Sequence, residues 1–158
     1  MFKRILVVCI GNICRSPTAE ALIHARYHSR GIQTSSAGLG AMVGKPMDAS
    51  ALAMLQGHAD DFSGDTRLAL DAWLERGHVA RQLDDGILAQ HDLVLVMEDK
   101  HLKTIQTRHP QASGKTFLLG KWLDNVEIPD PYKQGTEAFT HVYGLIDRCV
   151  DSWDRYLR

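Results

Sequence analysis

The sequence lacks the features of a nucleic-acid-binding, membrane-spanning or secreted protein. Its 158 residues carry a net charge of −1, so no surplus of positive charge favours nucleic acid or an anionic membrane as a partner. No stretch approaches the roughly 20 consecutive apolar residues of a membrane span. The apolar run near the N-terminus is too short for a signal peptide, and no small-residue cleavage site follows it. We therefore expect no nucleic-acid partner and no membrane insertion.

Cysteine is also scarce. The chain has three cysteines, an odd number that does not suit a disulfide framework. Two of them, Cys9 and Cys14, lie close together in the sequence. This pattern indicates thiol chemistry in a reducing compartment, and we expect the protein to be cytoplasmic.

What the sequence does contain is the pattern of one α/β domain spanning residues 1–158. Hydrophobic residues make up 44% and charged residues 23%, as in an ordinary globular protein, and no repeat or linker interrupts the chain. Apolar, β-branched runs predict strands at Phe2–Val8, Ile32–Ala37, Leu93–Met97 and Lys115–Leu119. Helical patterns lie between and after them, at about residues 16–29, 48–56, 98–108 and 136–156. Such alternation favours right-handed crossovers and a doubly wound parallel sheet.

The stretch VVCIGNICRSPTAEAL, residues 7–22, carries the strongest functional signal. It runs from the first predicted strand through Cys9 into a helix, for which Ser16 is the expected N-cap, Pro17 the first residue and Glu20 an acidic residue of the first turn. Ligands of open α/β sheets bind at this end of the strands. Backbone N–H groups and the positive end of the helix would form a nest for an anion, around which Gly11 lets the backbone curl. The guanidinium of Arg15 matches two phosphate oxygens.

The same positive field favours the thiolate form of Cys9. A thiolate at the base of a phosphate-binding loop is a nucleophile directed at phosphorus. The leaving oxygen then needs a proton, and Asp130, held between two prolines in IPDPY, is the best candidate for the acid. The carboxylate of Asp130 could later accept a proton from the attacking water. A simple turn-forming aspartate is the other interpretation of Asp130.

The motif CIGNICRSP with a late Asp-Pro-Tyr resembles the low-molecular-weight protein tyrosine phosphatases. The resemblance is closest to the bacterial branch that acts on tyrosine autokinases controlling exopolysaccharide or capsule export. It extends over nearly the whole chain, through Ser36–Gly38, Gly44–Pro46, His78–Gln82 and Asp92–Met97. It implies a three-layer sandwich whose four parallel strands have the order 2-1-3-4, with the phosphate-binding loop after the first strand.

The resemblance also implies a role for each site residue. Cys9 would be the nucleophile, Arg15 the phosphate clamp, and Asp130 the general acid and then the general base. Other positions would bind phosphate or shape its site: Ile10, Gly11, Ile13 and Cys14 in the loop, Asn12 holding the loop's shape, Ser16 donating to the thiolate, and Leu39 and Tyr132 as walls beside the substrate ring. No metal or cofactor is implied. The implied partner is a phosphotyrosine protein, the tail of a bacterial tyrosine kinase, with phosphate and other oxyanions as competitive ligands.

One segment departs from the family pattern. Between Gln56 and Gly77 the chain has roughly a dozen residues more than the resemblance leads us to expect. We expect a helical insertion around residues 57–76, with a helix at Thr66–Arg76 whose apolar face includes Leu70, Trp73 and Leu74.

The residues leave several alternatives open. Cys14 could pair with Cys9 under oxidation or could be a packing residue, whereas Cys149 is expected in the core. His78 could support the active-site loop or cap local structure. His24 and His28 have a metal-ligand spacing but no third ligand, which favours a solvated helix face.

Three other functions compete with phosphotyrosine hydrolysis. Arsenate reduction would need a further thiol to relay a disulfide, and only Cys149 remains for it. Phosphoarginine phosphatases resemble this chain but have Thr where Ile13 stands, and the branched apolar side chain favours an aryl phosphate. A pure phosphate-binding module would have no need of a nucleophile such as Cys9.

Overall fold

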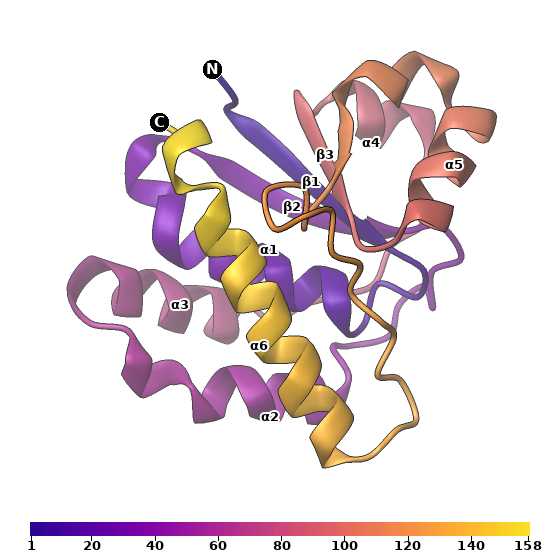
Figure 1. Ribbon diagram of the computed structural model, residues 1–158. Coiled ribbons are helices and arrows are strands. Elements are labelled where there is room, and N and C mark those ends of the chain that lie inside the picture. Colours follow the sequence, from indigo (N-terminus) through magenta and orange to yellow (C-terminus); the bar gives the residue numbers. More distant parts are fainter.

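The computed structural model describes residues 1–158 as a four-stranded parallel sheet covered by helices on both faces (Figure 1). The strands have the order β2-β1-β3-β4, which confirms the fold class expected from the sequence. Each strand pairs in parallel with its neighbours. Their bounds are β1 Arg4–Cys9, β2 Gln33–Gly38, β3 Leu93–Val96 and β4 Thr116–Leu118.

Six α-helices cover the sheet, four on one face and two on the other (Figure 1). The first group is α1 Arg15–Tyr27, α2 Ala49–Gly57, α3 Gly64–Arg76 and α6 Thr136–Ser152. The second group is α4 Asp85–Ala89 and α5 Asp99–Arg108. Short 3-10 turns lie at His28–Arg30, Ala59–Asp61, Pro110–Lys115 and Asp154–Tyr156. None of the helices has both the length and the apolar composition that a membrane crossing requires.

The two faces of the sheet form two separate cores because successive strand residues point to opposite sides. Ile5 and Val7 of β1 join the larger core of 33 buried residues beneath α1 and α6. Leu6 and Val8 join the smaller core of 10 residues beneath α4 and α5. All four side chains are completely buried, which explains why β1 is a continuous apolar run rather than an alternating one.

The start of α1 differs from the sequence prediction. The expectation that Ser16 is the N-cap is wrong, because α1 begins at Arg15 and Cys14 occupies the N-cap position. The hydroxyl of Ser16 is engaged instead by the side chains of Cys9 and Asn12. The earlier start also leaves no acidic residue in the first turn, so the predicted position of Glu20 is wrong as well.

The segment after α2 contains the helix expected from its apolar spacing. The predicted helix Thr66–Arg76 lies within α3, and Leu70 and Trp73 are buried against the larger core. The indole of Trp73 and the guanidinium of Arg76 both donate to the carboxylate of Glu20 on α1. This segment is therefore packed into the same unit as the sheet, and its description as an insertion stays a prediction.

Candidate active site

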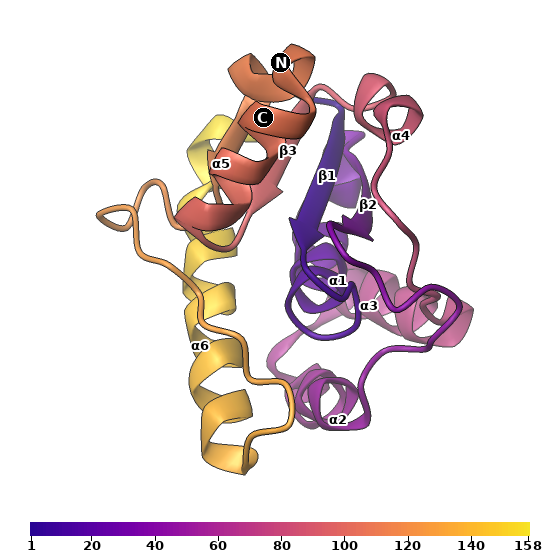
Figure 2. The same cartoon turned by 90° about the vertical axis from the view of Figure 1, so that its right-hand side faces the viewer.

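A tight loop, residues 10–14, joins the end of β1 to the start of α1 (Figure 2). The carbonyl oxygens of residues 9–14 each accept a hydrogen bond from a donor outside the loop: the N–H groups of Leu39, Gly40, Met42, Asp48 and Thr18, and the ring of His78. None of the five N–H groups of residues 10–14 donates to an acceptor in the protein. The loop therefore has its carbonyls occupied and its N–H groups available, which is the arrangement that anion binding requires.

Asn12 holds the loop in this conformation. Its backbone has φ 58°, a left-handed value that asparagine tolerates better than most residues. Its buried side-chain amide donates to the hydroxyls of Ser16 at 2.8 Å and Ser36 at 2.9 Å, and its oxygen accepts from the backbone N–H of Arg81 at 3.0 Å. The side chain of Asn12, which we expect to hold the loop's shape, is thus bonded to residues from three parts of the chain.

His78 and Gly38 support the loop from outside. Since a carbonyl oxygen can only accept, Nε2 of His78 carries the proton that it donates to the carbonyl of Asn12 over 2.6 Å. His78 therefore takes the loop-supporting role that the sequence left open. A Cβ atom at Gly38 would lie 2.3 Å from the carbonyl oxygen of Ile10, so only glycine lets β2 and the loop approach this closely.

Cys9 lies at the end of β1, and its side chain is almost completely buried. Its Sγ is 2.9 Å from Oγ of Ser16. Because Oγ of Ser16 already accepts from Asn12, its own proton is free to point at the sulfur. A hydroxyl donating to Sγ stabilises negative charge on the sulfur.

Arg15 is fixed by contacts from two later segments. Its guanidinium is 2% exposed and donates through Nη1 to Oε2 of Glu98 at 2.6 Å and to the carbonyl of Ile128 at 2.8 Å. Burial alone would raise the pKa of Glu98, but the hydrogen bond and charge of Arg15 bring that pKa below its ordinary value. Glu98 therefore remains a carboxylate that aims Arg15, leaving Nη2 to face the other side of the site.

Asp130 approaches that other side. One of its oxygens accepts from the backbone N–H of Tyr132 at 3.1 Å, and the other lies 3.8 Å from Nη2 of Arg15. Its side chain is 49% exposed, so water can reach it. The flanking Pro129 and Pro131 restrict the backbone on both sides.

A cavity of about 190 Å³ brings most of the predicted residues together. It is lined by Cys9, Ile10, Gly11, Asn12, Ile13, Cys14, Arg15, Gly40, Met42, Asp130 and Tyr132. Ser16 lies behind Cys9 rather than in the lining. Leu39 does not line the cavity either, because its side chain is buried in the smaller core. The wall expected at Leu39 stays a prediction, and Gly40 and Met42 line the cavity after β2.

The other cysteines are buried thiols. Cys9, Cys14 and Cys149 are all free. Burial raises the pKa of the Cys14 thiol far above its ordinary value, and the nearby carboxylates of Asp48 and Asp130 add to this effect. Cys14 is therefore a protonated thiol at the end of the loop, and Cys149 is a core residue of α6 as expected.

Two functional residues escaped the sequence interpretation. Glu98 is the second residue after β3, at the same end of the sheet as Cys9, and this position was a usable signal. Met42 lies in an irregular stretch after β2, and no pattern in the sequence distinguishes it from its neighbours.

Because of His101 in α5, we expect the stability of the protein to depend on pH in the acid range. His101 is completely buried, and burial, followed by the charge of Arg15, lowers its pKa to about 4 from an ordinary 6.5. As pH falls from about 6.5 to about 4, His101 binds a proton in the unfolded chain but stays neutral in the folded chain. The free energy of unfolding should therefore fall over this range, by at most on the order of 3 kcal/mol from this group.

The His101→Gln variant tests this prediction. Nδ1 of His101 accepts from the backbone N–H of Glu98, and a Gln oxygen can take the same bond at this helix position. Urea unfolding at several pH values should show a flatter decline for His101→Gln than for the wild type. The exposed His141→Gln is the matched control and should keep the wild-type slope. Equal slopes in all three proteins would contradict the assignment.

Comparison with known proteins places this site in a family. A sequence model described as "Low molecular weight phosphotyrosine protein phosphatase" matches residues 4–158. The low molecular weight protein-tyrosine-phosphatase Wzb of Escherichia coli K12 is 42% identical over 157 residues, covering 99% of this chain and 97% of Wzb.

Solved structures show the same likeness. Wzb from Escherichia coli K30 in complex with phosphate has a TM-score of 0.82 and 40% identity, with 100% of each chain covered. Wzb from Vibrio vulnificus in complex with benzylphosphonate has a TM-score of 0.82 and 35% identity, with 99% of each chain covered. The arginine phosphatase YwlE of Geobacillus stearothermophilus is more distant, with a TM-score of 0.78 and 27% identity over 98% of this chain and 92% of that one.

Proposed function

This chain belongs to the low molecular weight phosphotyrosine protein phosphatase family and is a protein-tyrosine phosphatase; we propose that it acts through a phosphocysteine formed on Cys9. The observation that carries the proposal is the loop itself. Five N–H groups without protein acceptors and the fixed guanidinium of Arg15 surround a cavity with Sγ of Cys9 in its lining. That combination binds a phosphate and places a nucleophile beside it.

In the first step, Sγ of Cys9 attacks phosphorus as the thiolate. The S–P bond forms while the bond from phosphorus to the tyrosine oxygen breaks, and the carboxyl of Asp130 gives that oxygen its proton. The loop N–H groups and Arg15 stabilise the charge on the three remaining phosphate oxygens. Glu98 acts through Arg15 as a positioning residue, because it contacts the guanidinium and not the cavity.

In the second step, water attacks the phosphocysteine. The carboxylate of Asp130 accepts a proton from this water, the S–P bond breaks, and Cys9 returns to the thiolate as inorganic phosphate leaves. The hydroxyl of Ser16, 2.9 Å from Sγ, stabilises the departing sulfur as it did before the attack. Apart from this water, all groups that the two steps use come from the chain and the substrate.

The cavity walls favour an aromatic leaving group. Ile13, Met42 and Tyr132 provide apolar surface at its edge, whereas a phosphoserine side chain is short and a phosphoarginine side chain is polar at the phosphate. Phosphotyrosine peptide should therefore be hydrolysed with a kcat/KM at least about 100-fold above that of matched phosphoserine and phosphoarginine peptides. Phosphate release from the three peptides measures this directly. Equal or faster phosphoarginine hydrolysis would instead support the arginine phosphatase alternative.

The substrate protein and the compartment are finer parts of the proposal. We propose that the substrate is a bacterial tyrosine kinase whose tail carries phosphotyrosines, because the bacterial Wzb proteins are named protein-tyrosine-phosphatases and match almost the full chain. We propose the cytoplasm as the compartment because the fold contains no disulfide among its three cysteines, as is usual for proteins of reducing compartments. Dephosphorylation of a purified kinase tail, with Cys9→Ser as the inactive comparison, tests the substrate.

A further inference from the structure

A second polar cavity, of about 260 Å³, lies at the opposite end of the sheet from Cys9. Arg4 and Gln33 begin β1 and β2, and His91 lies two residues before the start of β3, so the cavity is at the amino-terminal ends of these strands. No apolar and no acidic side chain lines it. Its lining includes Arg4, Gln33, Ser35, Arg81, Gln90 and His91.

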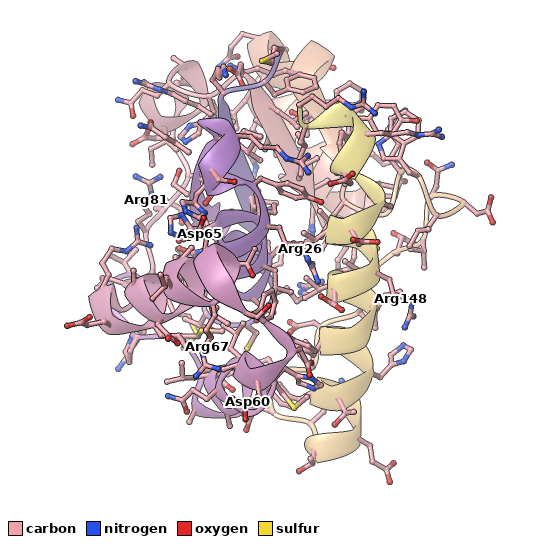
Figure 3. All side chains as sticks on the ribbon, turned by 90° about the vertical axis from the view of Figure 1, so that its left-hand side faces the viewer. Arg26, Asp60, Asp65, Arg67, Arg81 and Arg148 are labelled. Atoms are coloured by element: carbon pink, nitrogen blue, oxygen red, sulfur yellow. The ribbon has the colours of Figure 1, made fainter.

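Two of the lining residues are arginines without a carboxylate partner. Arg81 is half-buried and donates only through Nε to the carbonyl of Ser36, at 2.9 Å, and through Nη2 to the hydroxyl of Ser35, at 3.1 Å. Three of its five N–H bonds remain without an acceptor in the protein. The exposed guanidinium of Arg4 makes no ion pair or hydrogen bond. In Figure 3, Arg81 lies on the opposite side of the view from α6 and Arg148.

A chain of hydrogen bonds fixes Arg81 in this cavity. Nδ1 of His91 lies 2.6 Å from the carbonyl of Ile87 and must donate to it, so Nε2 accepts the proton of Ser35 over 2.6 Å. With its proton directed at His91, the hydroxyl of Ser35 presents its lone pairs to Arg81. Burial lowers the pKa of His91, so the neutral ring that this order requires is the prevailing form at neutral pH.

We propose that this cavity is a second oxyanion site, which binds inorganic phosphate, the product of the reaction. Two unpaired guanidinium groups give it a net positive charge, and the amide groups of Gln33 and Gln90 add neutral donors. A guanidinium fork that is already oriented loses little freedom when it binds a tetrahedral anion. No lining residue carries a carboxylate that would repel that anion, and the carboxylate of the neighbouring Asp92 accepts from the backbone N–H groups of Lys3 and Arg4.

Arg81 links the second site to the phosphate-binding loop at the other end of the sheet. The backbone N–H of Arg81 donates to the side chain of Asn12, and its Nε donates to Ser36, whose hydroxyl accepts from the same Asn12 side chain. Signals from Arg81 would therefore respond to both sites. Arg4, Gln90 and His91, which make no contact with the loop, are the reporters that separate the two.

Residue-resolved amide chemical shifts of the full chain, followed during titration with sodium phosphate, test the proposal. Sodium chloride at the same ionic strength is the reference. We expect the amides of Arg4, Gln90 and His91 to shift to saturation with a dissociation constant different from that of the loop, residues 10–14. In Arg4→Gln the dissociation constant at the second site should rise by about threefold or more, while that of the loop stays unchanged. In Arg81→Gln the dissociation constant at the second site should rise by about tenfold. Arg148→Gln removes the same charge at an exposed position of α6 and should change neither dissociation constant.

Several results would overturn the second site. The proposal fails if the shifts of Arg4, Gln90 and His91 do not saturate with phosphate. It also fails if sodium chloride produces the same shifts, or if the shifts give the same dissociation constant as the loop. The proposal also fails if the dissociation constant at the second site is unchanged in Arg4→Gln. This test remains valid even if Arg81→Gln does not fold, because the side chain of Arg4 makes no hydrogen bond or ion pair that the substitution would remove.

Discussion

Replacing Cys9 by serine should abolish hydrolysis of an aryl phosphate, lowering kcat on the order of 10⁵-fold or more, and should leave phosphate binding largely intact. A serine hydroxyl is not ionised at neutral pH. Its side-chain neighbour, Ser16, accepts from Asn12 and donates toward position 9, so it cannot act as a general base there. The loop N–H groups and Arg15 are untouched by the change, so the site that binds the anion remains.

Steady-state hydrolysis of an aryl phosphate and a phosphate titration, made on the same preparation, separate these two effects. Cys149→Ala is the matched control, because it removes another buried thiol, from the core of α6, far from the loop in sequence. It should cost stability but keep turnover. If Cys9→Ser retained turnover, Cys9 would not be the nucleophile. If it lost both turnover and phosphate binding, the loop would have been disrupted and the comparison would have to be repeated with Cys9→Ala.

The loop could be predicted because its chemistry is contiguous in the sequence. Cys9 and Arg15 belong to one strand–loop–helix unit, so their proximity follows from local geometry alone. Asp130 could be predicted because its two prolines mark a rigid segment. Only the family resemblance, however, predicted that Asp130 lies close to the loop, since no local pattern in the sequence brings residue 130 near residue 15.

The partners that hold the loop could not be predicted in the same way. Glu98 is 83 residues from Arg15, and the backbone N–H of Arg81 is 69 residues from Asn12. These contacts depend on β1 lying between β2 and β3, an order that hydrophobic periodicity does not determine. The apolar pattern identifies strands and their burial, but not their neighbours.

The wrong N-cap assignment at Ser16 has a physical cause. Ser16 has the residue type of an N-cap. In the structure, however, its hydroxyl contacts the sulfur of Cys9 and the side-chain amide of Asn12. Tertiary contacts that a short window of sequence does not contain outweigh local propensity there. The side chain of Leu39 packs in the core beneath α4 and α5, and the wall that the resemblance implies at this residue stays a prediction.

Replacing Asp130 by asparagine should slow the reaction about 10²–10⁴-fold for a phosphotyrosine peptide, whose leaving oxygen needs a proton. An aryl phosphate with a strongly electron-withdrawing ring leaves as the anion without help, so its hydrolysis should fall much less. Asparagine keeps the size of the side chain and can still accept the hydrogen bond from the backbone of Tyr132. The change therefore removes the proton and the charge while leaving the geometry of the loop in place.

A series of aryl phosphates of graded leaving-group pKa measures this difference. In the wild type, log kcat/KM should depend only weakly on the leaving group, whereas in Asp130→Asn the slope should become steep, because negative charge then accumulates on the leaving oxygen. Asp124→Asn is the matched control, since it makes the same substitution at an exposed aspartate with no side-chain partner and a left-handed φ of 53° that asparagine tolerates. It should keep both rate and slope. Equal slowing of good and poor leaving groups in Asp130→Asn would mean that the carboxylate orients Arg15, 3.8 Å away, rather than donating a proton.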